Sequence, residues 1–324
     1  MKLTVAQKVD DEMIDLIRTR VGGTLEIDFL YGSNEMARAS ILERTEILLS
    51  MNIRRDIRGN EFPFLSRARL IQITLAGADT IPFDRLNPET IICSNSGAYS
   101  VPIAEHAIGM MLALARDFLP LHRELSRGAF DQTTVHKMLG GSTLGIIGFG
   151  GIGKRTADIA RAFGMKILAI NRSGMTEEKV DFVGTLSDLG FVLQKSDFVL
   201  LAIALNRRTR NLIGKKELDV MKQDATLVNV ARGELVDEKA LYDHLKANPR
   251  FKAGIEAWWV EPFNFPRFEV HFPFFQLDNV LGSPHNSYLT EGIFAKALDA
   301  SLENILRFAR GGTPRNIQKP EDYV

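Results

Sequence analysis

Three glycines in the middle of the chain have the spacing of a nucleotide-binding loop. Gly148, Gly150 and Gly153 form the pattern G-x-G-x-x-G within "GIIGFGGIGKRTADIARAFGMKILAINRS", residues 145–173. Apolar residues 144–147 precede the glycines, a stretch with helical spacing follows them, and "KILAI" closes the unit. This order of strand, turn, helix and strand favours a dinucleotide-binding loop over the alternative, a tight strand-to-helix turn with no ligand. We expect the backbone N–H groups near the helix start to hold the cofactor phosphates, at Gly148, Gly150, Gly151, Ile152 and Gly153.

The tip of the second strand favours a phosphorylated nucleotide. NAD-binding units usually place Asp or Glu there, roughly 20 residues after the first glycine, to hold the ribose hydroxyls. This chain has Asn171, followed by Arg172 and Ser173. A 2′-phosphate would meet no carboxylate there, and the guanidinium and hydroxyl could bind it. We therefore expect NADP(H) as the preferred cofactor, with NAD(H) as the alternative if Arg172 stacks on adenine instead.

Composition narrows the class of protein. A chain of 324 residues with 45% apolar and 25% charged residues has room for two ordinary globular domains. Lys plus Arg and Asp plus Glu both number 40, so the formal net charge is zero and a nucleic-acid partner is not expected. The single cysteine, Cys93, excludes an internal disulfide and argues against a cysteine-based metal site. Without a signal-peptide core or a membrane-spanning run, we expect a cytoplasmic protein with no membrane partner.

Strand-like and helix-like segments alternate early in the chain, which predicts a parallel sheet covered by helices. A long helical pattern covers residues 102–128, and Pro120 inside it should kink or split the helix. A last helical pattern covers residues 292–312, and its return to the first domain stays open at this point. The other predicted elements are a helix at 35–44 and strands at 24–30, 46–51, 70–76, 90–95, 197–203, 225–231, 252–259 and 279–283.

Further motifs follow in a recognisable order between residues 70 and 290. They are "NSGAYSVPIAEH" (95–106), "SDFVLLAIALNRRTRNLIG" (196–214), "MKQDATLVNVARGELVD" (221–237), "EAWWVEP" (256–262) and "SPHN" (283–286). With the glycine loop, they resemble the signatures of the D-isomer-specific 2-hydroxyacid dehydrogenase family. The resemblance is strongest to its glyoxylate/hydroxypyruvate reductase and phosphoglycerate dehydrogenase branch.

The resemblance implies an α/β fold of two Rossmann-like or flavodoxin-like domains with parallel sheets and an active site between them. The NAD(P)-binding domain, residues 102–286, would be inserted into a discontinuous substrate domain, residues 1–101 plus 287–324. The implied reaction is hydride transfer between a nicotinamide and a small 2-keto or D-2-hydroxy acid. The implied assembly is a homodimer formed largely by the nucleotide domain.

By the same resemblance, Arg232, Glu261 and His285 fall on the family's catalytic trio. Arg232 follows the apolar strand 225–231, at the end where open α/β sheets bind ligands, and its guanidinium suits a carboxylate and a carbonyl oxygen. His285 follows another predicted strand, and an imidazole can exchange a proton near neutral pH. We expect Glu261 to pair with His285 and to keep it able to donate a proton to the developing alkoxide.

The resemblance also implies contacts to cofactor and substrate. Glu256 lies where the family commonly has Asp near the nicotinamide amide, and Ala204 lies where the signature usually has Pro. "LAGADTI" (75–81) resembles a turn whose backbone N–H groups, near Gly77 and Ala78, would hold the substrate carboxylate. Residues expected to border the cofactor are Thr209, Val230, Ala231, Glu256 and His285.

Glyoxylate or hydroxypyruvate is the expected substrate, with three alternatives. Phosphoglycerate dehydrogenases tend to carry Arg-Ser where this chain has Ser50 and Met51, although Arg54 and Arg55 lie close by. Formate dehydrogenases replace the histidine-paired glutamate with glutamine, so Glu261 argues against them. Nucleotide-sensing corepressors that resemble the family keep the trio but need an additional peptide-docking surface.

A long segment rich in Phe and Pro, "PFNFPRFEVHFPFFQLDN" (262–279), has no assigned role. Its aromatic residues either pack on Trp258 and Trp259 of the same domain or form a contact in a dimer.

Overall fold

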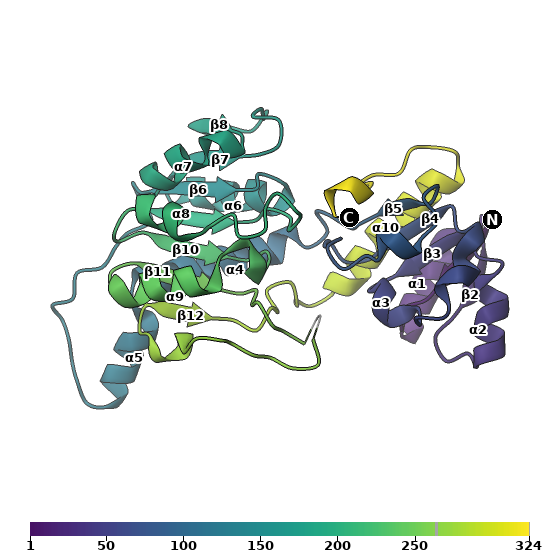
Figure 1. Cartoon of the computed structure of the whole chain (residues 1–324), viewed down its shortest axis with the longest axis horizontal. Helices are drawn as coiled ribbons and strands as arrows, with labels where there is room; N and C mark the ends of the chain where they lie inside the picture. Colours follow the sequence, from purple (N-terminus) through teal and green to yellow (C-terminus); the bar gives the residue numbers. More distant parts are fainter. Residues whose placement is uncertain (263–264, 324) are drawn as a thin grey trace. The chain divides into compact units, whose positions relative to one another are not determined.

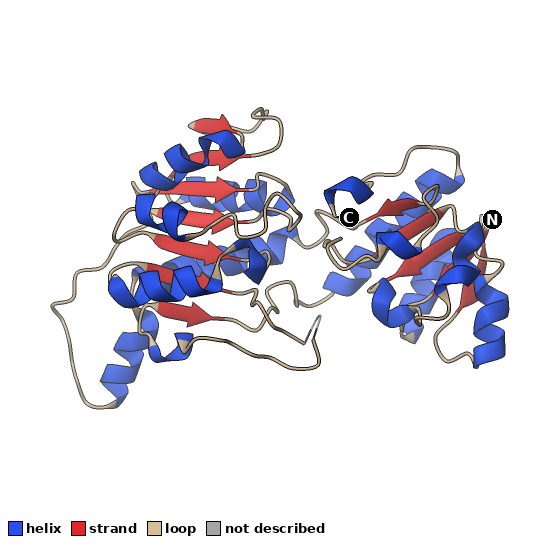
Figure 2. Ribbon diagram, in the orientation of Figure 1, coloured by secondary structure: helices blue, strands red, loops and turns tan. Residues whose placement is uncertain are grey.

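The structure, a computed structural model, describes residues 1–262 and 265–323. The chain divides into two compact units, Met1–Tyr99 with Glu291–Val324 (unit 1) and Ser100–Thr290 (unit 2). Each unit is built on one sheet of parallel strands with helices packed on it, and Figure 2 shows this layering in each unit. The predicted α/β class with two parallel sheets is therefore confirmed. Across the described residues, no helix combines the length and apolar character needed to cross a bilayer.

Unit 1 contains a five-stranded sheet in the order β2-β1-β3-β4-β5 (Figure 1). Most of its strands are short apolar runs, and "ILLS" of β3 and "LIQI" of β4 are buried along their whole length. Strands covered on both faces by helices need such continuous apolar sequence. The strands β3 and β4 are shorter than the predicted runs 46–51 and 70–76. The strands are β1 (Lys2–Val5), β2 (Glu26–Phe29), β3 (Ile47–Ser50), β4 (Leu70–Ile73) and β5 (Ile91–Cys93).

Four α-helices belong to this sheet, and the last comes from the end of the chain. The C-terminal helix α10 packs against α1 and β4, with Leu298, Leu302 and Ile305 in one core with Leu3 and Ile17. The return of this helix to the first hundred residues, left open by sequence, is thus decided by its apolar face. The helices are α1 (Asp11–Val21), α2 (Glu35–Leu42), α3 (Ile53–Asp56) and α10 (Ile293–Ala309).

Unit 2 contains a seven-stranded sheet in the order β12-β11-β10-β9-β6-β7-β8. The first strand of this sheet, β6, lies in its middle, and β7 and β8 follow on one side. The chain then returns, and β9 pairs with the other side of β6. In open parallel sheets, ligands bind at such a reversal, beyond the carboxyl ends of the strands. The strands are β6 (Thr143–Ile147), β7 (Lys166–Ile170), β8 (Phe182–Gly184), β9 (Phe198–Leu201), β10 (Thr226–Asn229), β11 (Lys252–Ile255) and β12 (Val280–Gly282).

The helices of unit 2 cover both faces of its sheet (Figure 1). The most apolar of them, α4, packs against α6, β10 and β11 and buries most of its residues. The α-helices are α4 (Ser100–Ala115), α5 (Phe118–Ser126), α6 (Gly151–Ala162), α7 (Leu189–Lys195), α8 (Lys215–Val220) and α9 (Glu238–Ala247). Short 3₁₀ turns in the two units are Phe62–Arg67, Phe83–Arg85, Leu186–Asp188, Gly233–Leu235, Phe274–Gln276 and Pro320–Asp322.

Two boundaries differ from the prediction. The predicted helix 102–128 is split as expected, but at Asp117, which has left-handed backbone (φ 52°), rather than at Pro120. Pro120 lies in the first turn of α5, where its missing N–H removes no helical hydrogen bond. The predicted strand 252–259 ends at Ile255, since the backbone carbonyl of Glu256 accepts instead from the N–H of His285 (3.0 Å).

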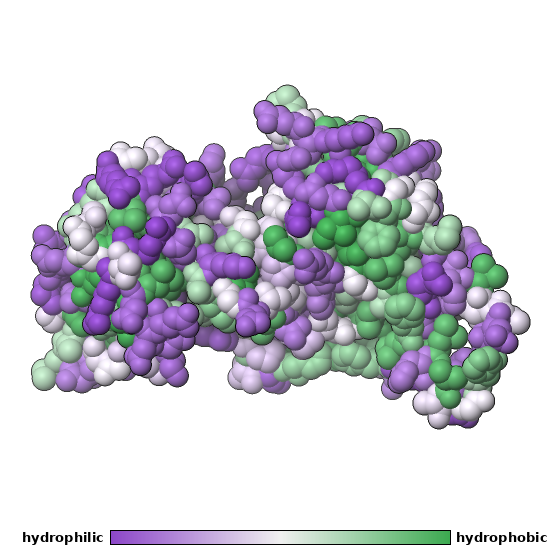
Figure 3. Space-filling model, turned by 180° about the vertical axis from the view of Figure 1, so that it is seen from behind, coloured by the Kyte–Doolittle hydropathy of each residue, from purple (hydrophilic) through white to green (hydrophobic). Residues whose placement is uncertain are grey.

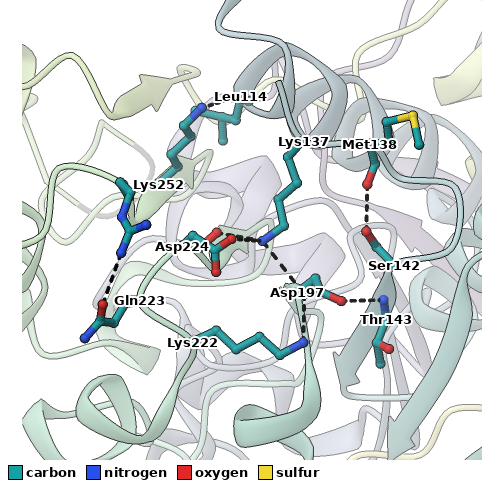
Figure 4. Close-up of polar contacts among 11 residues, drawn as sticks. Leu114, Lys137, Met138, Ser142, Thr143, Asp197, Lys222, Gln223, Asp224 and Lys252 are labelled. Carbon is teal, nitrogen blue, oxygen red and sulfur yellow. Dashed lines mark hydrogen bonds and ion pairs between the residues drawn. The ribbon is translucent and has the colours of Figure 1, made fainter. Parts of the chain in front are cut away.

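Charged side chains tie the segments together at the amino end of the unit 2 sheet (Figure 4). Asp197 accepts from the N–H of Thr143 (2.9 Å) and from Nζ of Lys222 (2.7 Å), while Nζ of Lys137 donates to the carbonyl of Asp224 (2.7 Å). Burial alone would raise the pKa of Asp197, but these hydrogen bonds and the two lysine charges lower it overall. Ion pairs and hydrogen bonds therefore join the segments at the amino end of this sheet.

One buried ion pair in unit 1 yields a stability prediction. Nε and Nη2 of Arg38 donate to the two carboxylate oxygens of Glu61, both at 2.6 Å, and both side chains are less than a tenth exposed. The hydrogen bonds from Arg38 outweigh burial and lower the pKa of Glu61. The stabilisation is therefore complete above the ordinary glutamate pKa and is lost as pH falls through the lowered value.

We expect Glu61→Gln to lower the free energy of unfolding by about 3 kcal/mol at pH 7, because it leaves a buried guanidinium without its counter-charge. Urea denaturation at pH 7 and at acid pH measures the effect, and the difference from wild type should shrink in acid. The matched control is Asp299→Asn, which breaks the exposed pair with Arg20 (2.6 Å) and should cost less than about 1 kcal/mol. Equal losses in the two variants would contradict the prediction.

Candidate active site

The glycine loop lies at the carboxyl end of β6, next to the strand reversal. A Cβ on Gly148 (φ 104°) would lie 2.5 Å from backbone atoms of Ala202 and Ile203, and one on Gly153 would lie 2.4 Å from the carbonyl oxygen of Gly148. These two glycines are therefore required by close packing of the turn. A Cβ built on Gly150 meets no described atom within 4 Å, so this glycine faces open space at the start of α6. The loop thus has the form that lets a phosphate approach the first N–H groups of a helix.

The residues after β7 form a compact turn. Oδ1 of Asn171 accepts from the N–H groups of Ser173 (3.1 Å) and Gly174 (2.7 Å), and Nδ2 donates to the carbonyl of Met175 (2.8 Å). The amide of Asn171 therefore shapes the turn, which sequence reasoning did not foresee. Arg172 and Ser173 are exposed on it, and residues 171–175 include no carboxylate.

The hydroxyl of Thr209 is also used within its own loop. This buried side chain donates to the carbonyl of Ala204 (2.7 Å) and accepts from the N–H of Asn206 (2.8 Å). The family signature at this position thus stabilises the loop after β9.

Arg232 is positioned by a short hydrogen-bonded turn at the end of β10. The side chain of Asn229 accepts from the N–H of Ala231 (3.1 Å) and donates to the carbonyl of Arg232 (2.7 Å), while Nη1 of Arg232 donates to the carbonyl of Ala231 (2.8 Å). A Cβ on the next residue, Gly233, would lie 2.4 Å from the backbone of Trp258. Asn229 and Gly233 are therefore positioning residues that sequence reasoning missed, although both are in the motif "NVARG".

Glu261 and His285 lie together although 24 residues separate them. Nδ1 of His285 is 2.6 Å from Oε1 of Glu261, and the N–H of Trp258 donates to Oε2 at 3.3 Å. The side chains of Glu261 and His285 are 8% and 19% exposed. A carboxylate oxygen can accept a hydrogen bond from Nδ1–H, and Nε2 is then the ring nitrogen that does not face Glu261.

The backbone at this pair is unusual and is held in place by its neighbours. His285 has left-handed backbone (φ 51°), and its N–H donates to the carbonyl of Glu256 (3.0 Å). Nε1 of Trp258 donates to the carbonyl of Ser283 (2.8 Å), which joins the two segments that carry the pair. A non-glycine residue in this conformation persists only where its surroundings impose it, and such strain is typical of functional sites.

Glu256 is fully buried in the same unit. Oε1 accepts from the N–H of Ser287 (2.9 Å), whereas Oε2 has no hydrogen-bond partner among the residues that the structure describes. A buried carboxylate oxygen without a donor is costly, so a donor from a ligand would fit it.

Gly77 and Ala78 belong to unit 1 and follow β4 there. Ala78 is buried, and the N–H of Asn95 donates to the carbonyl of Leu75 (2.9 Å) in the segment before them. The predicted residues Val230 and Ala231 follow β10 in unit 2, in the turn that precedes Arg232.

Comparison with known proteins identifies the family. Residues 108–287 match the model of the NAD-binding domain of D-isomer-specific 2-hydroxyacid dehydrogenases. The chain is 34% identical to a D-3-phosphoglycerate dehydrogenase of Methanocaldococcus jannaschii over 74% of its length but only 45% of that protein, so it spans less than half of that relative. It is 29% identical to a glyoxylate reductase of Thermococcus gammatolerans, over 99% of this chain and 96% of that protein.

A solved structure of similar fold has a cofactor. An acyclic imino acid reductase in complex with NADPH and D-Arg is 25% identical and superposes with a TM-score of 0.79, over 98% of this chain and 100% of that one. The family model covers more than half of the chain and ends at the predicted histidine motif. The chain therefore belongs to the D-isomer-specific 2-hydroxyacid dehydrogenase family of nicotinamide-dependent oxidoreductases.

Proposed function

We propose that the protein is an NADPH-preferring reductase of small 2-keto acids, with glyoxylate or hydroxypyruvate as substrate. The observation that carries the proposal is the 2.6 Å hydrogen bond between Glu261 and His285 in unit 2. Reduction of a carbonyl needs a proton donor at the oxygen, and a carboxylate-oriented imidazole is suited to that role.

His285 supplies the proton. With Nδ1 held by Glu261, Nε2 points to the other side of the ring and can protonate the alkoxide as it forms. The nearby carboxylate fixes the orientation of the ring, so the donor is aligned before the reaction. Glu261 acts through His285 and is therefore a positioning residue.

Arg232 binds the substrate. Its guanidinium lies on the turn after β10 and is oriented by the carbonyl of Ala231. A planar guanidinium can hold the carboxylate of the keto acid and polarise its carbonyl, which stabilises charge developing on the oxygen. In unit 1, the N–H groups near Gly77 and Ala78 are the proposed second contact to the carboxylate.

The residues present fit a dinucleotide. The open space at Gly150 and the first turn of α6 suit the pyrophosphate, while the unpaired Oε2 of Glu256 suits the carboxamide N–H of a nicotinamide. When bound, a reduced nicotinamide supplies the hydride. Val230, Ala231, Thr209 and His285 are the other proposed neighbours of the ring.

The preference for NADPH rests on the turn after β7. Arg172 and Ser173 are exposed there, residues 171–175 include no carboxylate that would repel a 2′-phosphate, and the side chain of Asn171 accepts hydrogen bonds within the turn. The complex of the related imino acid reductase with NADPH supports this preference.

We expect Glu261→Gln to lower kcat by roughly 10–100-fold, because the glutamine accepts the same hydrogen bond without a charge. His285→Asn should lower kcat by roughly 10²–10⁴-fold. Steady-state reduction of glyoxylate measures both, and cofactor fluorescence titration checks that NADPH still binds. The matched control is Glu238→Gln, which removes a carboxylate 2.6 Å from Nδ1 of His271 on the surface and should change kcat less than roughly twofold. Wild-type kcat in Glu261→Gln would contradict the proposed role.

We expect wild-type protein to reduce glyoxylate or hydroxypyruvate faster with NADPH than with NADH. Arg172→Ala should raise the KM for NADPH roughly tenfold and leave the KM for NADH near its wild-type value. Only NADPH has a 2′-phosphate, so only NADPH would lose a contact with the guanidinium. Lys195→Ala, which removes an exposed cation at the end of α7, is the control. Equal rates with both nucleotides would contradict the cofactor preference but not the reductase. No turnover of either acid would contradict the reductase, and oxidation of 3-phosphoglycerate instead would favour the alternative activity.

We also propose that the protein is a homodimer formed through α5 and the segment that follows it. Within the described chain α5 buries no residue, although its apolar side chains lie on one face. Phe118, Leu125 and Phe130 are 59%, 56% and 76% exposed. Figure 3 shows hydrophobic residues gathered over this end of unit 2. An exposed apolar patch of this kind is typical of a protein interface.

Light scattering should give the wild type twice the chain mass of 36.2 kDa. Leu125→Lys combined with Phe130→Lys should shift the mass toward that of one chain, because each lysine would bury a charge in the interface. Met175→Lys, on an exposed turn elsewhere in unit 2, should leave the mass unchanged. A monomeric wild type would contradict the dimer.

A further inference from the structure

An aromatic pocket lies beside the Glu261–His285 pair in unit 2. Its volume is about 520 Å³, and three rings contribute to its wall, Trp258, Phe268 and Phe275. Their centroids are 5.2–6.2 Å apart, with Trp258 and Phe268 nearly perpendicular. Trp258 is 3% exposed, whereas Phe268 and Phe275 are 47% and 56% exposed, so the pocket has a buried floor and an apolar rim open to solvent.

The pocket is held open by the backbone around it. Gly282 lies in its wall, and a Cβ there would come within 2.8 Å of the Trp258 ring and 3.2 Å of the Phe275 ring. The loop that carries the two phenylalanines is anchored by an antiparallel bridge between Val260 and Glu269. The aromatic wall is therefore fixed on unit 2.

The pocket adjoins the proposed proton donor. Glu261 and His285 both line it, as do two prolines. The polar side chains in the wall have partners within unit 2, since Glu261 accepts from His285 and Trp258, and Oγ of Ser283 donates to Asn286 (3.2 Å). A group that enters the pocket would therefore meet ring faces and aliphatic carbon, which favours an apolar group over a charged one.

We propose that this pocket binds an apolar side chain of the substrate, so that, besides the small 2-keto acids of the proposed function, the protein reduces 2-keto acids with an aromatic or other bulky apolar substituent at C3. The proposal rests on the proposed reductase function and names its substrate class. Benzene fits an apolar cavity of about 150 Å³, so a benzyl group is well within the volume present. Burial of the substituent would cover Phe268 and Phe275 and leave the keto-acid head at His285.

The test compares phenylpyruvate with glyoxylate, which has no side chain, under NADPH. The wild type should reduce both acids, and its kcat/KM for phenylpyruvate should be at least equal to that for glyoxylate, because burial of the ring offsets its larger size. Phe268→Asp with Phe275→Asp should reduce this ratio by roughly tenfold or more, because a charged rim opposes entry of an apolar ring. Phe265→Asp is the matched control, since this residue is 45% exposed on the same loop but is not in the pocket wall, and the ratio should stay as in wild type.

A binding measurement separates this inference from catalysis. 3-Phenylpropionate, which has the side chain and carboxylate but no keto group, should change the tryptophan fluorescence of the wild type and not that of the double aspartate variant, and Trp259→Phe would leave Trp258 as the one tryptophan that reports on the pocket. Reduction of glyoxylate without reduction of phenylpyruvate, or an unchanged ratio in the double variant, would overturn the pocket assignment and leave the reductase standing. No reduction of either acid would overturn the proposed function, and the pocket assignment with it.

Discussion

A carboxylate that is nearly removed from water must find donors, and the organisation around Glu261 follows from that constraint. Its side chain is 8% exposed, and the imidazole of His285 and the N–H of Trp258 are its partners. An unpaired charge in such a place would cost several kcal/mol. The segments 256–262 and 282–287 must therefore stay in register, which they do through the hydrogen bonds of Glu256 and Trp258 to the second segment. The glycine after Arg232 contributes, because its missing side chain lets the backbone of Trp258 approach.

The two ends of the unit 2 sheet carry different kinds of residue. The carboxyl end has loops with glycine and short polar side chains, and Oε2 of Glu256 there has no hydrogen-bond partner among the described residues. These features leave backbone groups or space for a ligand. The amino end is closed by lysines and aspartates that pair with one another and with backbone groups (Figure 4). This division follows from the parallel sheet, in which all strands deliver their loops to the same two edges. The ion pairs and the proposed ligand contacts therefore lie at opposite edges of this sheet.

The aromatic segment after Glu261 both packs on unit 2 and lines the space beside His285. Trp259 stacks on Phe274, and Tyr242 of α9 stacks on Phe272, so part of this segment packs on the core of unit 2. Of the two readings that its sequence permits, packing on its own domain is thus the one seen for residues 265–279, while residues 263–264 lie outside the described part. The rings of Phe268 and Phe275 remain half exposed around the pocket. The same segment therefore both stabilises the unit and shapes the space next to His285.

The sequence by itself determined the features that depend on local periodicity and local backbone demands. The βαβ unit, the glycine turn at Gly148 and the apolar strands could be predicted because each rests on residues a few positions apart. The motifs likewise named Arg232, Glu261 and His285 as candidates and identified the family.

Tertiary structure decided what depends on distant partners. The helix breaks at Asp117 rather than at Pro120. At Asp117, the carboxylate accepts a hydrogen bond from Nζ of Lys252, 135 residues away (2.5 Å). The segment 256–259 leaves the strand, since Glu256 and Trp258 hydrogen-bond to residues 283–287. The unpaired oxygen of Glu256 and the aromatic pocket were invisible in the sequence for the same reason. Each is created by segments that meet only when the sheet has formed, and no local pattern encodes that meeting.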